Sequence, residues 1–227
     1  MTTMKAMLIE RYGKQQPLRL ADVPVPAIGE HEILAEIHAA SVNPVDFKIR
    51  DGKLKLLLHF DMPLILGNDF AGVVRAVGSK VQRFKVGDAV YGRPRKSNIG
   101  TFAQFIAAHE DDIAPKPANL SFEEAASVPL LGLTAYQALY DLMHLQAGQK
   151  ILIQAGAGGV GTFAIQLAKS MGAYVATTAS EAGAPLVQSL GADRIINYHL
   201  ENFAQVLHDY DAVLDTLGGE ALLQSFQ

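Results

Sequence analysis

The 227-residue sequence contains no cysteine. This absence rules out disulfides, thiol nucleophiles and any zinc site that is built on thiolates. The sequence also lacks any run of about 18 uninterrupted apolar residues, the length that a membrane-spanning helix needs. Its opening residues, MTTMKAMLIERYG, become charged too early for a secretory signal. We therefore expect a cytoplasmic protein that makes no use of a membrane.

A strong charge of either sign is also missing. There are 19 Lys and Arg residues against 23 Asp and Glu residues, which gives a formal net charge of −4. No basic run of the kind that follows a phosphate backbone occurs, so nucleic acid is not an expected partner. The length suits one large domain or two small ones.

The first half of the sequence alternates short β-rich runs with turn signals. Runs such as KAMLIE, EILAEIHAASV and FAGVVRAVG are separated by turn sequences such as PVPAIGEH and RFKVGD. Short strands at this spacing are typical of a mostly antiparallel barrel or sandwich. We predict a first domain of this kind over residues 1–120.

From Ser121 onward the pattern becomes one of alternating helices and strands. Ser121 and Glu124 form the sequence signature of a capping box, and Pro129 is expected to divide the following helix into two pieces. Four β-rich runs with helices between them indicate a parallel sheet, namely KILIQAG, AYVATTAS, DRIINY and DAVLDTL. A doubly wound dinucleotide fold has about six strands, so we expect residues 121–227 to form an incomplete one, in which the chain stops.

A glycine-rich loop lies between the first of these strands and a helix. Gly156, Gly158 and Gly161 follow the spacing GxGxxG. We expect Gly156 to allow a tight turn, Gly158 to let the backbone approach a pyrophosphate, and Gly161 to let the helix pack closely. The alternative is a small-residue turn that serves only packing. The predicted cofactor-binding residues of the loop are Gly156, Ala157, Gly158, Gly159, Val160 and Gly161.

The position that selects the cofactor is occupied by Ser180, 19 residues after Gly161. A serine there leaves room for a 2′-phosphate that an aspartate would repel, which favours NADP(H) over NAD(H). No Lys or Arg occurs between Lys169 and Arg194, so this stretch lacks a cationic clamp for that phosphate. The neighbouring Glu181 can be an ordinary solvated residue.

Seven motifs occur in a characteristic order along the chain: ASVNPVDFKIRDG, LGNDFAGVVRAVGSKV, RFKVGDAVYG, GTFAQFIA, LSFEEAASVPLLGLTAYQAL, AGAGGVG and SLGADRIINY. Together they resemble the medium-chain dehydrogenases/reductases, and within them the zinc-independent quinone oxidoreductase branch. The resemblance covers nearly the whole chain. It implies a GroES-like barrel domain followed by a partial Rossmann domain, with the active site in the cleft between them. It also implies that the segment which closes the barrel follows the Rossmann domain and is missing.

The resemblance also bears on metals. Zinc-dependent members of the family carry Gly-His-Glu where this sequence has Gly67, Asn68 and Asp69, and a cysteine near Ser41. A catalytic zinc needs thiolate or imidazole ligands, and these positions offer neither. The cysteine-rich loop of structural zinc is absent as well. We therefore predict no metal, with direct hydride transfer from NADPH to a quinone or an α,β-unsaturated carbonyl.

Three residues of NPVDFK are the predicted catalytic residues: Asn43, Asp46 and Lys48. By resemblance, Asn43 lies near the nicotinamide and is counted as cofactor-binding too. Without the resemblance, Asn43 initiates a turn with Pro44 and Asp46 is a helix N-cap. Lys48 stands where several quinone reductases have a tyrosine, and either donates to a substrate carbonyl or is simply solvated.

Two further cofactor-binding residues come from the resemblance. Thr134 matches a threonine at the nicotinamide end, and Tyr198 matches a tyrosine near the adenosine end. The alternatives are a helix-cap or core hydroxyl for Thr134 and an ordinary strand-end aromatic for Tyr198. We expect Asp69 to be held by hydrogen bonds or by a cation such as Arg75 or Lys48, and Asn68 to bind backbone.

The sequence thus predicts a zinc-independent, NADP(H)-dependent reductase of quinones or enones. Two alternatives stay open: a non-catalytic module that holds a dinucleotide or a protein partner, and a zinc-free enoyl reductase or alcohol dehydrogenase on the same scaffold. The oligomeric state is open as well, although the resemblance suggests a homodimer.

Overall fold

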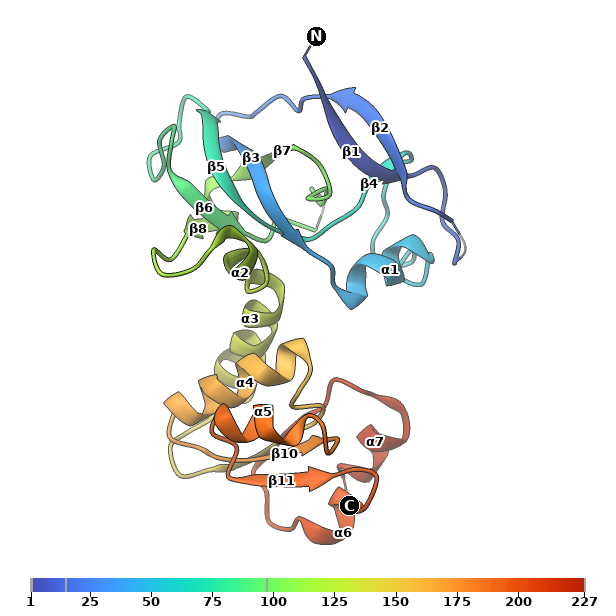
Figure 1. Cartoon of the computed structure of the whole chain (residues 1–227), viewed down its shortest axis with the longest axis vertical. Coiled ribbons are helices and arrows are strands. Elements are labelled where there is room, and N and C mark those ends of the chain that lie inside the picture. The colour runs from blue at the N-terminus through green and yellow to red at the C-terminus, as the bar shows by residue number, and fades with distance from the viewer. Residues whose placement is uncertain (1, 15, 97, 227) are drawn as a thin grey trace. The chain divides into compact units, whose positions relative to one another are not determined.

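The computed structural model describes residues 2–14, 16–96 and 98–226, and it divides into two units, residues 1–130 and 131–227 (Figure 1). The boundary lies ten residues beyond the predicted one, because helix α2 (Phe122–Ala126) packs on the first unit. Ala125 and Ala126 of this helix are buried in one cluster with Ala71. None of the described helices is long and apolar enough to span a bilayer.

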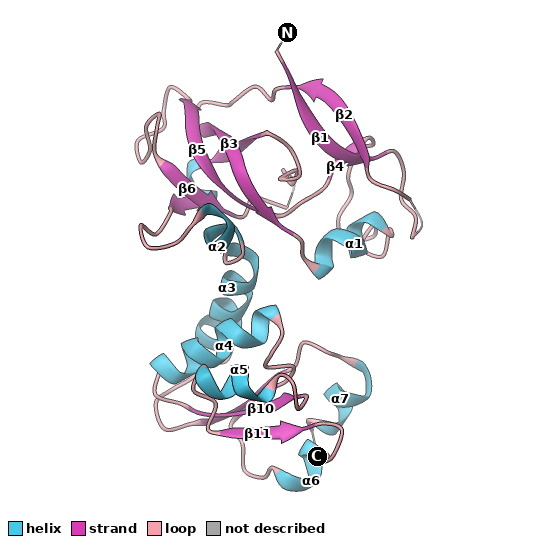
Figure 2. Cartoon of the chain, in the orientation of Figure 1, coloured by secondary structure: helices cyan, strands magenta, loops and turns pink. Residues whose placement is uncertain are grey.

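The first unit is built from antiparallel strands (Figure 2). Five strands form a sheet in the order β7-β3-β5-β6-β8, and three form a sheet in the order β2-β1-β4. The prediction of a mostly antiparallel domain is therefore confirmed. The strands are β1 (Thr3–Ile9), β2 (Arg19–Pro24), β3 (Glu32–Ser41), β4 (Leu64–Ile65), β5 (Asp69–Val77), β6 (Ala89–Gly92), β7 (Phe105–His109) and β8 (Ile113–Pro115), and the helices before α2 are α1 (Pro44–Arg50) and the 3₁₀-helix η1 (Glu110–Asp112).

Two strands at the centre of the five-stranded sheet supply most of its core. Ile33 and Ala35 of β3 pack with Phe70 and Val74 of β5, and all four side chains are fully buried. Burying large apolar side chains contributes about 1.5–3 kcal/mol each, so this pair of strands anchors the unit. The last residue of β3 and the first of β5, Ser41 and Asp69, are register partners and bring two polar side chains to the end of this core.

The second unit contains a parallel sheet in the order β11-β10-β9-β12. The strand order reverses at β9, and such a switch point is where open α/β sheets bind ligands, at the carboxyl ends of the strands. The strands are β9 (Lys150–Ile153), β10 (Tyr174–Ala179), β11 (Arg194–Asn197) and β12 (Ala212–Leu214). The helices are α3 (Pro129–Tyr136), whose first two residues belong to the first unit, the π-helical η2 (Gln137–Leu142), α4 (Gly159–Ser170), α5 (Ala184–Ser189), α6 (Phe203–Val206) and α7 (Gly219–Gln224).

Local signals in the sequence account for the start of this helical region. The capping box is present, since Ser121 N donates to Glu124 Oε2 at 2.8 Å and Glu124 N donates to Ser121 Oγ at 3.1 Å. The expected break at Pro129 is also found, because α2 ends at Ala126 and α3 begins at Pro129. These residues therefore fold as their local chemistry dictates.

Two leucines of η2 test where the core of the second unit lies. Leu139 is fully buried in it, whereas Leu142 is 78% exposed. Leu139→Ala should lower the free energy of unfolding by about 2–5 kcal/mol, because it leaves a cavity. The matched Leu142→Ala change should cost less than about 0.5 kcal/mol. Urea denaturation followed by circular dichroism measures both, and equal losses would contradict this placement of the core.

Candidate active site

The carboxylate of Asp69 is fully buried where β5 begins. Its Oδ2 atom accepts hydrogen bonds from Ser41 Oγ at 2.9 Å and from Asn43 Nδ2 at 2.8 Å. Its Oδ1 atom accepts one from the backbone N–H of Leu130 at 2.9 Å. Three neutral donors therefore hold this charge, as a buried carboxylate requires.

Asp69 is held by hydrogen bonds, the first of the two expected possibilities, and neither Arg75 nor Lys48, the cations named for the second, pairs with it. Arg75 lies six residues farther along the same strand, about 20 Å away at the rise of a β-strand, and its Nε donates to Glu36 Oε2 at 2.7 Å. Lys48 is exposed, and its side chain makes neither an ion pair nor a hydrogen bond with a described residue.

Asp46 is a second buried carboxylate, 2% exposed. It occupies the third position of α1, where its Oδ2 accepts from the backbone N–H of Asn43 at 2.6 Å. Its Oδ1 accepts from Asn68 Nδ2 at 2.7 Å. Two sequence-based interpretations are corrected here: the N-cap is Asn43 and not Asp46, and Asn68 binds this side chain instead of backbone.

Burial raises the pKa of both carboxylates above the ordinary value of 3.8. The hydrogen bond from Asn68 to Asp46 and the bond from Asn43 to Asp69 oppose that shift, and so does the positive charge of Arg93. Desolvation is the largest effect for each, since neutral donors replace only part of the lost hydration.

These contacts fix the orientation of Asn43, which is 8% exposed. Its amide nitrogen donates to Asp69 and also to Ser41 Oγ at 3.2 Å. Its backbone N–H is held by Asp46. An amide that donates through its nitrogen leaves its oxygen as the acceptor atom, so the network defines which polar atom this side chain can offer.

The positions that hold zinc ligands in zinc-dependent members of the resembled family are brought together here. Ser41, Asn68 and Asp69 lie in one hydrogen-bonded network, and none of them is a thiolate or an imidazole. Among the described residues, no group of three His, Cys, Asp or Glu side chains is arranged to hold a metal. Catalysis without zinc stays a prediction.

The glycine-rich loop of the second unit is shaped by close packing. A Cβ atom on Gly161 would lie 2.4 Å from the carbonyl oxygen of Ala155, so only glycine lets α4 approach the loop, as expected. A Cβ on Gly156 would lie 2.0 Å from Thr177 Oγ1. Gly156 is therefore required by close packing against the neighbouring strand, whereas the residue with positive φ in the expected tight turn is Ala155, with φ of 53°.

Gly158 differs from these two glycines. A Cβ atom there would meet only Ala155 O, at 3.2 Å. Gly158 is also the N-cap of the twelve-residue helix α4, and no side chain caps that helix end. The first backbone N–H groups of α4, from Gly159 to Gly161, have no partner within the helix. A pyrophosphate suits this end, because it accepts hydrogen bonds and is favoured by the helix dipole.

Other predicted residues of the second unit lie at the carboxyl ends of the parallel strands, as the glycine-rich loop does. Ser180 comes directly after β10, and its Oγ accepts from Gly183 N at 3.2 Å. A Cβ on Gly183 would lie 2.9 Å from the Cβ of Ala157, so this turn packs against the glycine-rich loop. Tyr198 follows β11 and is 55% exposed, with its ring beside His199. These residues fit a dinucleotide that lies along the carboxyl ends of the strands.

The structure thus groups the predicted residues into two sets. Asn43, Asp46 and Lys48 belong to the first unit, whereas Thr134 in α3, the glycine-rich loop, Ser180 and Tyr198 belong to the second.

The sequence analysis missed two residues that hold the glycine-rich loop and the strand before it, Thr177 and Thr178. Thr177 Oγ1 donates to Ile153 O at 2.6 Å, and Thr178 Oγ1 accepts from Ala155 N at 2.9 Å. Their signal was a polar pair within the apolar run AYVATTAS.

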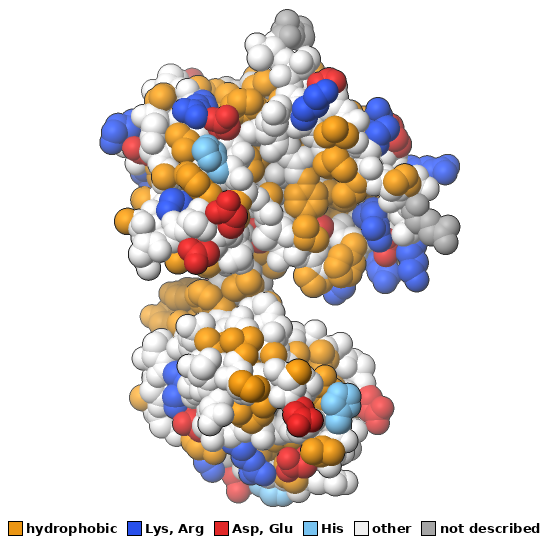
Figure 3. Space-filling model, in the orientation of Figure 1, with side chains coloured by type: hydrophobic (Ala, Val, Ile, Leu, Met, Phe, Trp, Pro, Cys, Tyr) orange, Lys and Arg blue, Asp and Glu red, His pale blue; other side chains and the backbone are white. Residues whose placement is uncertain are grey.

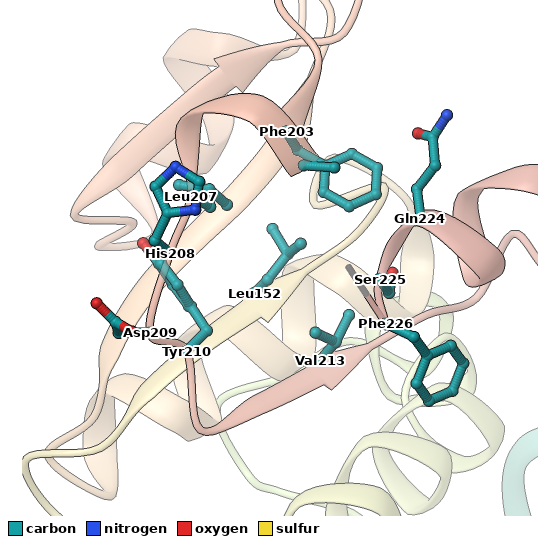
Figure 4. A pocket seen from close by; sticks show the side chains of 11 residues that line it. Leu152, Phe203, Leu207, His208, Asp209, Tyr210, Val213, Gln224, Ser225 and Phe226 are labelled. Carbon is teal, nitrogen blue, oxygen red and sulfur yellow. The ribbon is translucent and has the colours of Figure 1, made fainter.

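A pocket of about 340 Å³ opens in the second unit but contains none of the predicted residues (Figure 4). It lies over Leu152 of β9 and Val213 of β12, between side chains of α6 and of the segment around α7. The residues that line the pocket therefore include none of the glycine-rich loop. We assign it no role in cofactor binding.

Comparison with known proteins places this geometry in a family. Residues 29–118 match the alcohol dehydrogenase GroES-like domain, and residues 159–227 match the zinc-binding dehydrogenase family. The structure of the quinone oxidoreductase from Coxiella burnetii superposes with a TM-score of 0.88 and 40% identity, covering 99% of this chain and 72% of that one. The chain belongs to the medium-chain dehydrogenase/reductase superfamily. The predicted fold, a GroES-like domain followed by a Rossmann-type sheet, is confirmed.

Two curated relatives from this superfamily carry activities in their names. The 2-methylene-furan-3-one reductase of Solanum lycopersicum is 43% identical over 224 residues, which is 95% of this chain and 57% of the relative. The chloroplastic NADPH-dependent alkenal/one oxidoreductase of Arabidopsis thaliana is 41% identical over 224 residues, 95% of this chain and 58% of the relative. The chain thus spans somewhat more than half the length of these relatives.

Replacing Asp69 with Asn tests the electrostatics of the buried network. Because its folded-state pKa is raised, Asp69 contributes fully to stability below 3.8, and this contribution is lost as pH rises through the raised pKa. The difference in unfolding free energy, wild type minus Asp69→Asn, should therefore fall with rising pH across this window and level off above it. Chemical denaturation at a series of pH values measures the difference.

Asp88 provides a control of opposite sign. The backbone N–H of Lys85 donates to its carboxylate at 2.9 Å and lowers its pKa. Its contribution is present above 3.8 and is lost as pH falls, so the difference between wild type and Asp88→Asn should rise with pH. If the Asp69 difference rose as well, burial would not be the dominant influence on Asp69.

Proposed function

We propose that the protein is a zinc-independent oxidoreductase that uses NADPH to reduce quinones or α,β-unsaturated carbonyls. The observation that carries this proposal is the uncapped N-terminus of α4 at Gly158, beside two glycines that allow close packing. The names of the Coxiella, tomato and Arabidopsis relatives support the substrate class.

The preference for NADPH rests on Ser180. A neutral side chain at the end of β10 does not repel a 2′-phosphate, whereas a carboxylate there would. The bond from Gly183 N to Ser180 Oγ holds the hydroxyl in the turn that packs on Ala157. We propose that this turn accepts the phosphate. The activity named for the Arabidopsis relative is NADPH-dependent, which supports the same choice.

In the proposed reaction, NADPH supplies a hydride to a conjugated acceptor, which needs little Lewis-acid activation. Asn43 presents its amide oxygen as an acceptor, because its nitrogen is committed to Asp69 and Ser41. Lys48 is exposed on α1 and can donate a hydrogen bond to a substrate oxygen as charge develops there. Asp46 is a positioning residue, since its oxygens are bound to Asn43 N and Asn68 Nδ2.

Turnover by the 227-residue chain is the direct test. After treatment with a chelator, the protein should oxidise NADPH in the presence of a simple quinone, followed by NADPH absorbance, and should do so more efficiently than with NADH. Lys48→Met should lower kcat by about 10- to 100-fold if its ammonium stabilises the developing charge. Lys80→Met is the matched control, because Lys80 is an exposed lysine that pairs with Glu30.

The outcomes of this assay separate the candidate functions. Activity that the chelator abolishes would contradict the metal-free mechanism. Tight NADPH binding without turnover of quinones or enones would favour a non-catalytic dinucleotide-binding module. Equal affinities for NADPH and NADH would contradict the role of Ser180.

Alanine at two glycines should separate cofactor binding from folding. Gly158→Ala should change stability by less than about 1 kcal/mol, since Ala155 O is its nearest contact, but should weaken NADPH binding about tenfold or more by blocking the pyrophosphate. Gly161→Ala should destabilise the second unit, because its Cβ would meet backbone at 2.4 Å. Calorimetric titration and thermal unfolding measure the two effects. Unchanged NADPH affinity in Gly158→Ala would contradict the proposed site.

A further inference from the structure

One part of the first unit differs in charge from the rest of the chain. Residues 11–14 and 48–57, which we call the basic patch, contain six basic residues and one acidic residue, a net charge of +5 in a chain with a formal charge of −4. The two stretches are neighbours, since Gly13 N donates to Arg50 O at 2.8 Å. Figure 3 shows Lys and Arg side chains gathered on the side of this unit where Figure 1 shows α1.

The cations of the basic patch are left largely unpaired. Arg11, Lys14, Lys53 and Lys55 are exposed, and none of them forms an ion pair with a described residue. The acidic residue of the patch is already engaged, by Arg50 at 2.9 Å. Neighbouring cations without counter-charges create a local positive potential, which an anionic surface would neutralise.

Two leucines of the basic patch are not used by the core. Residues 54–58 form a helical turn in which Leu58 N donates to Leu54 O at 2.8 Å. Leu54 and Leu58 pack against the apolar cluster around Ile49. Leu56 and Leu57 are 94% and 83% exposed. Folding therefore explains the first pair of leucines and leaves the second pair in solvent, directly after Lys53 and Lys55 in the sequence.

We propose that the basic patch binds an anionic lipid surface. Leu56 and Leu57 enter the boundary between headgroups and acyl chains, while Lys53, Lys55 and the cations of residues 11–14 contact lipid phosphates and carboxylates. Peripheral binding of this kind combines inserted apolar side chains with attraction to anionic lipid. It needs no membrane-spanning helix, but it departs from the sequence-based expectation of a protein that makes no use of a membrane. A folded acidic protein fits less well, because protein interfaces are enriched in aromatic residues and depleted of lysine, whereas this patch exposes leucines and lysines.

The patch lies near Asn43, which bears on how the enzyme reaches its substrate. This part of the inference rests on the proposed function. Asn43 caps the N-terminus of α1 and the basic patch begins at its other end. A seven-residue helix is about 10 Å long. Apolar quinones and enones partition into bilayers, so docking through the patch places Asn43 close to their reservoir.

Vesicle flotation tests the lipid proposal without requiring turnover. Wild-type protein should float with phosphatidylcholine vesicles that contain phosphatidylserine, and much less with phosphatidylcholine alone. Added salt should release it, because the attraction is screened. The double variant Lys53→Gln, Lys55→Gln should bind anionic vesicles about 30-fold more weakly. The double variant Leu56→Ser, Leu57→Ser should also bind more weakly, with a loss that persists at every salt concentration.

A matched control removes the same charge elsewhere in the first unit. Lys80 and Lys85 are exposed and pair with Glu30 and Asp88. The double variant Lys80→Gln, Lys85→Gln should keep wild-type flotation, and circular dichroism checks the fold of every variant. The proposal is overturned if wild type ignores anionic vesicles at low salt, or if the control variant loses as much binding as the patch variant.

A soluble polyanion separates lipid from an acidic protein partner. Binding to polyglutamate as tight as to anionic vesicles, and unchanged in the leucine variant, would overturn the lipid proposal in favour of an acidic protein. Failure of vesicle binding with intact NADPH oxidation would leave the proposed function standing. Vesicle binding without NADPH oxidation would support the lipid proposal and contradict the proposed function.

Discussion

The geometry of the first unit depends on the burial of the Asp69 carboxylate without an ion pair to any described residue. A buried charge must be compensated by several donors, and here they come from three segments that are distant in the sequence. Ser41 ends β3, Asn43 begins the turn into α1, and Leu130 belongs to the helical region after α2. Satisfying one side chain therefore fixes the end of the core, the entry of α1 and the start of the helical region. The orientation of Asn43 is a consequence of the same requirement.

The second unit relies on steric fit where the first relies on hydrogen bonds. Gly156 and Gly161 remove the two Cβ atoms that would separate β9, β10 and α4, while Thr177 and Thr178 tie the loop to the strands. Because these contacts are made by backbone and short side chains, the loop is defined before any ligand arrives. If the proposed pyrophosphate site lies at this loop, its fixed shape avoids the entropy cost of ordering a loop during binding.

The sequence predicts what is local in this fold and misses what is long-range. The capping box at Ser121, the helix break at Pro129 and the loop between strand and helix depend on a few neighbouring residues, and they fold as expected. The donors to Asp69 lie 26 to 61 positions away, so the sequence predicts that this carboxylate needs hydrogen bonds or a cation but does not identify Ser41, Asn43 and Leu130 as its partners. Likewise, the reason for Gly156 is Thr177 on the adjacent strand, a contact that depends on strand pairing and not on the loop.

Helix α1 shows how one short element can serve two environments. Its first turn carries the buried Asp46 and its last turn carries Lys48 and Arg50, so the side-chain charges interact favourably with the helix dipole at both ends. Local stability alone would favour this arrangement. It also separates two environments. The acidic end belongs to the hydrogen-bonded network, where the bond from Asn43 N to Asp46 helps to hold Asn43 in place. At the basic end Lys48 is exposed, and Lys53 and Lys55 follow it in the sequence. A lipid surface that bound the basic end of α1 would therefore contact a helix whose other end is already held by hydrogen bonds. Such binding would orient the first unit on the surface without changing the position of Asn43.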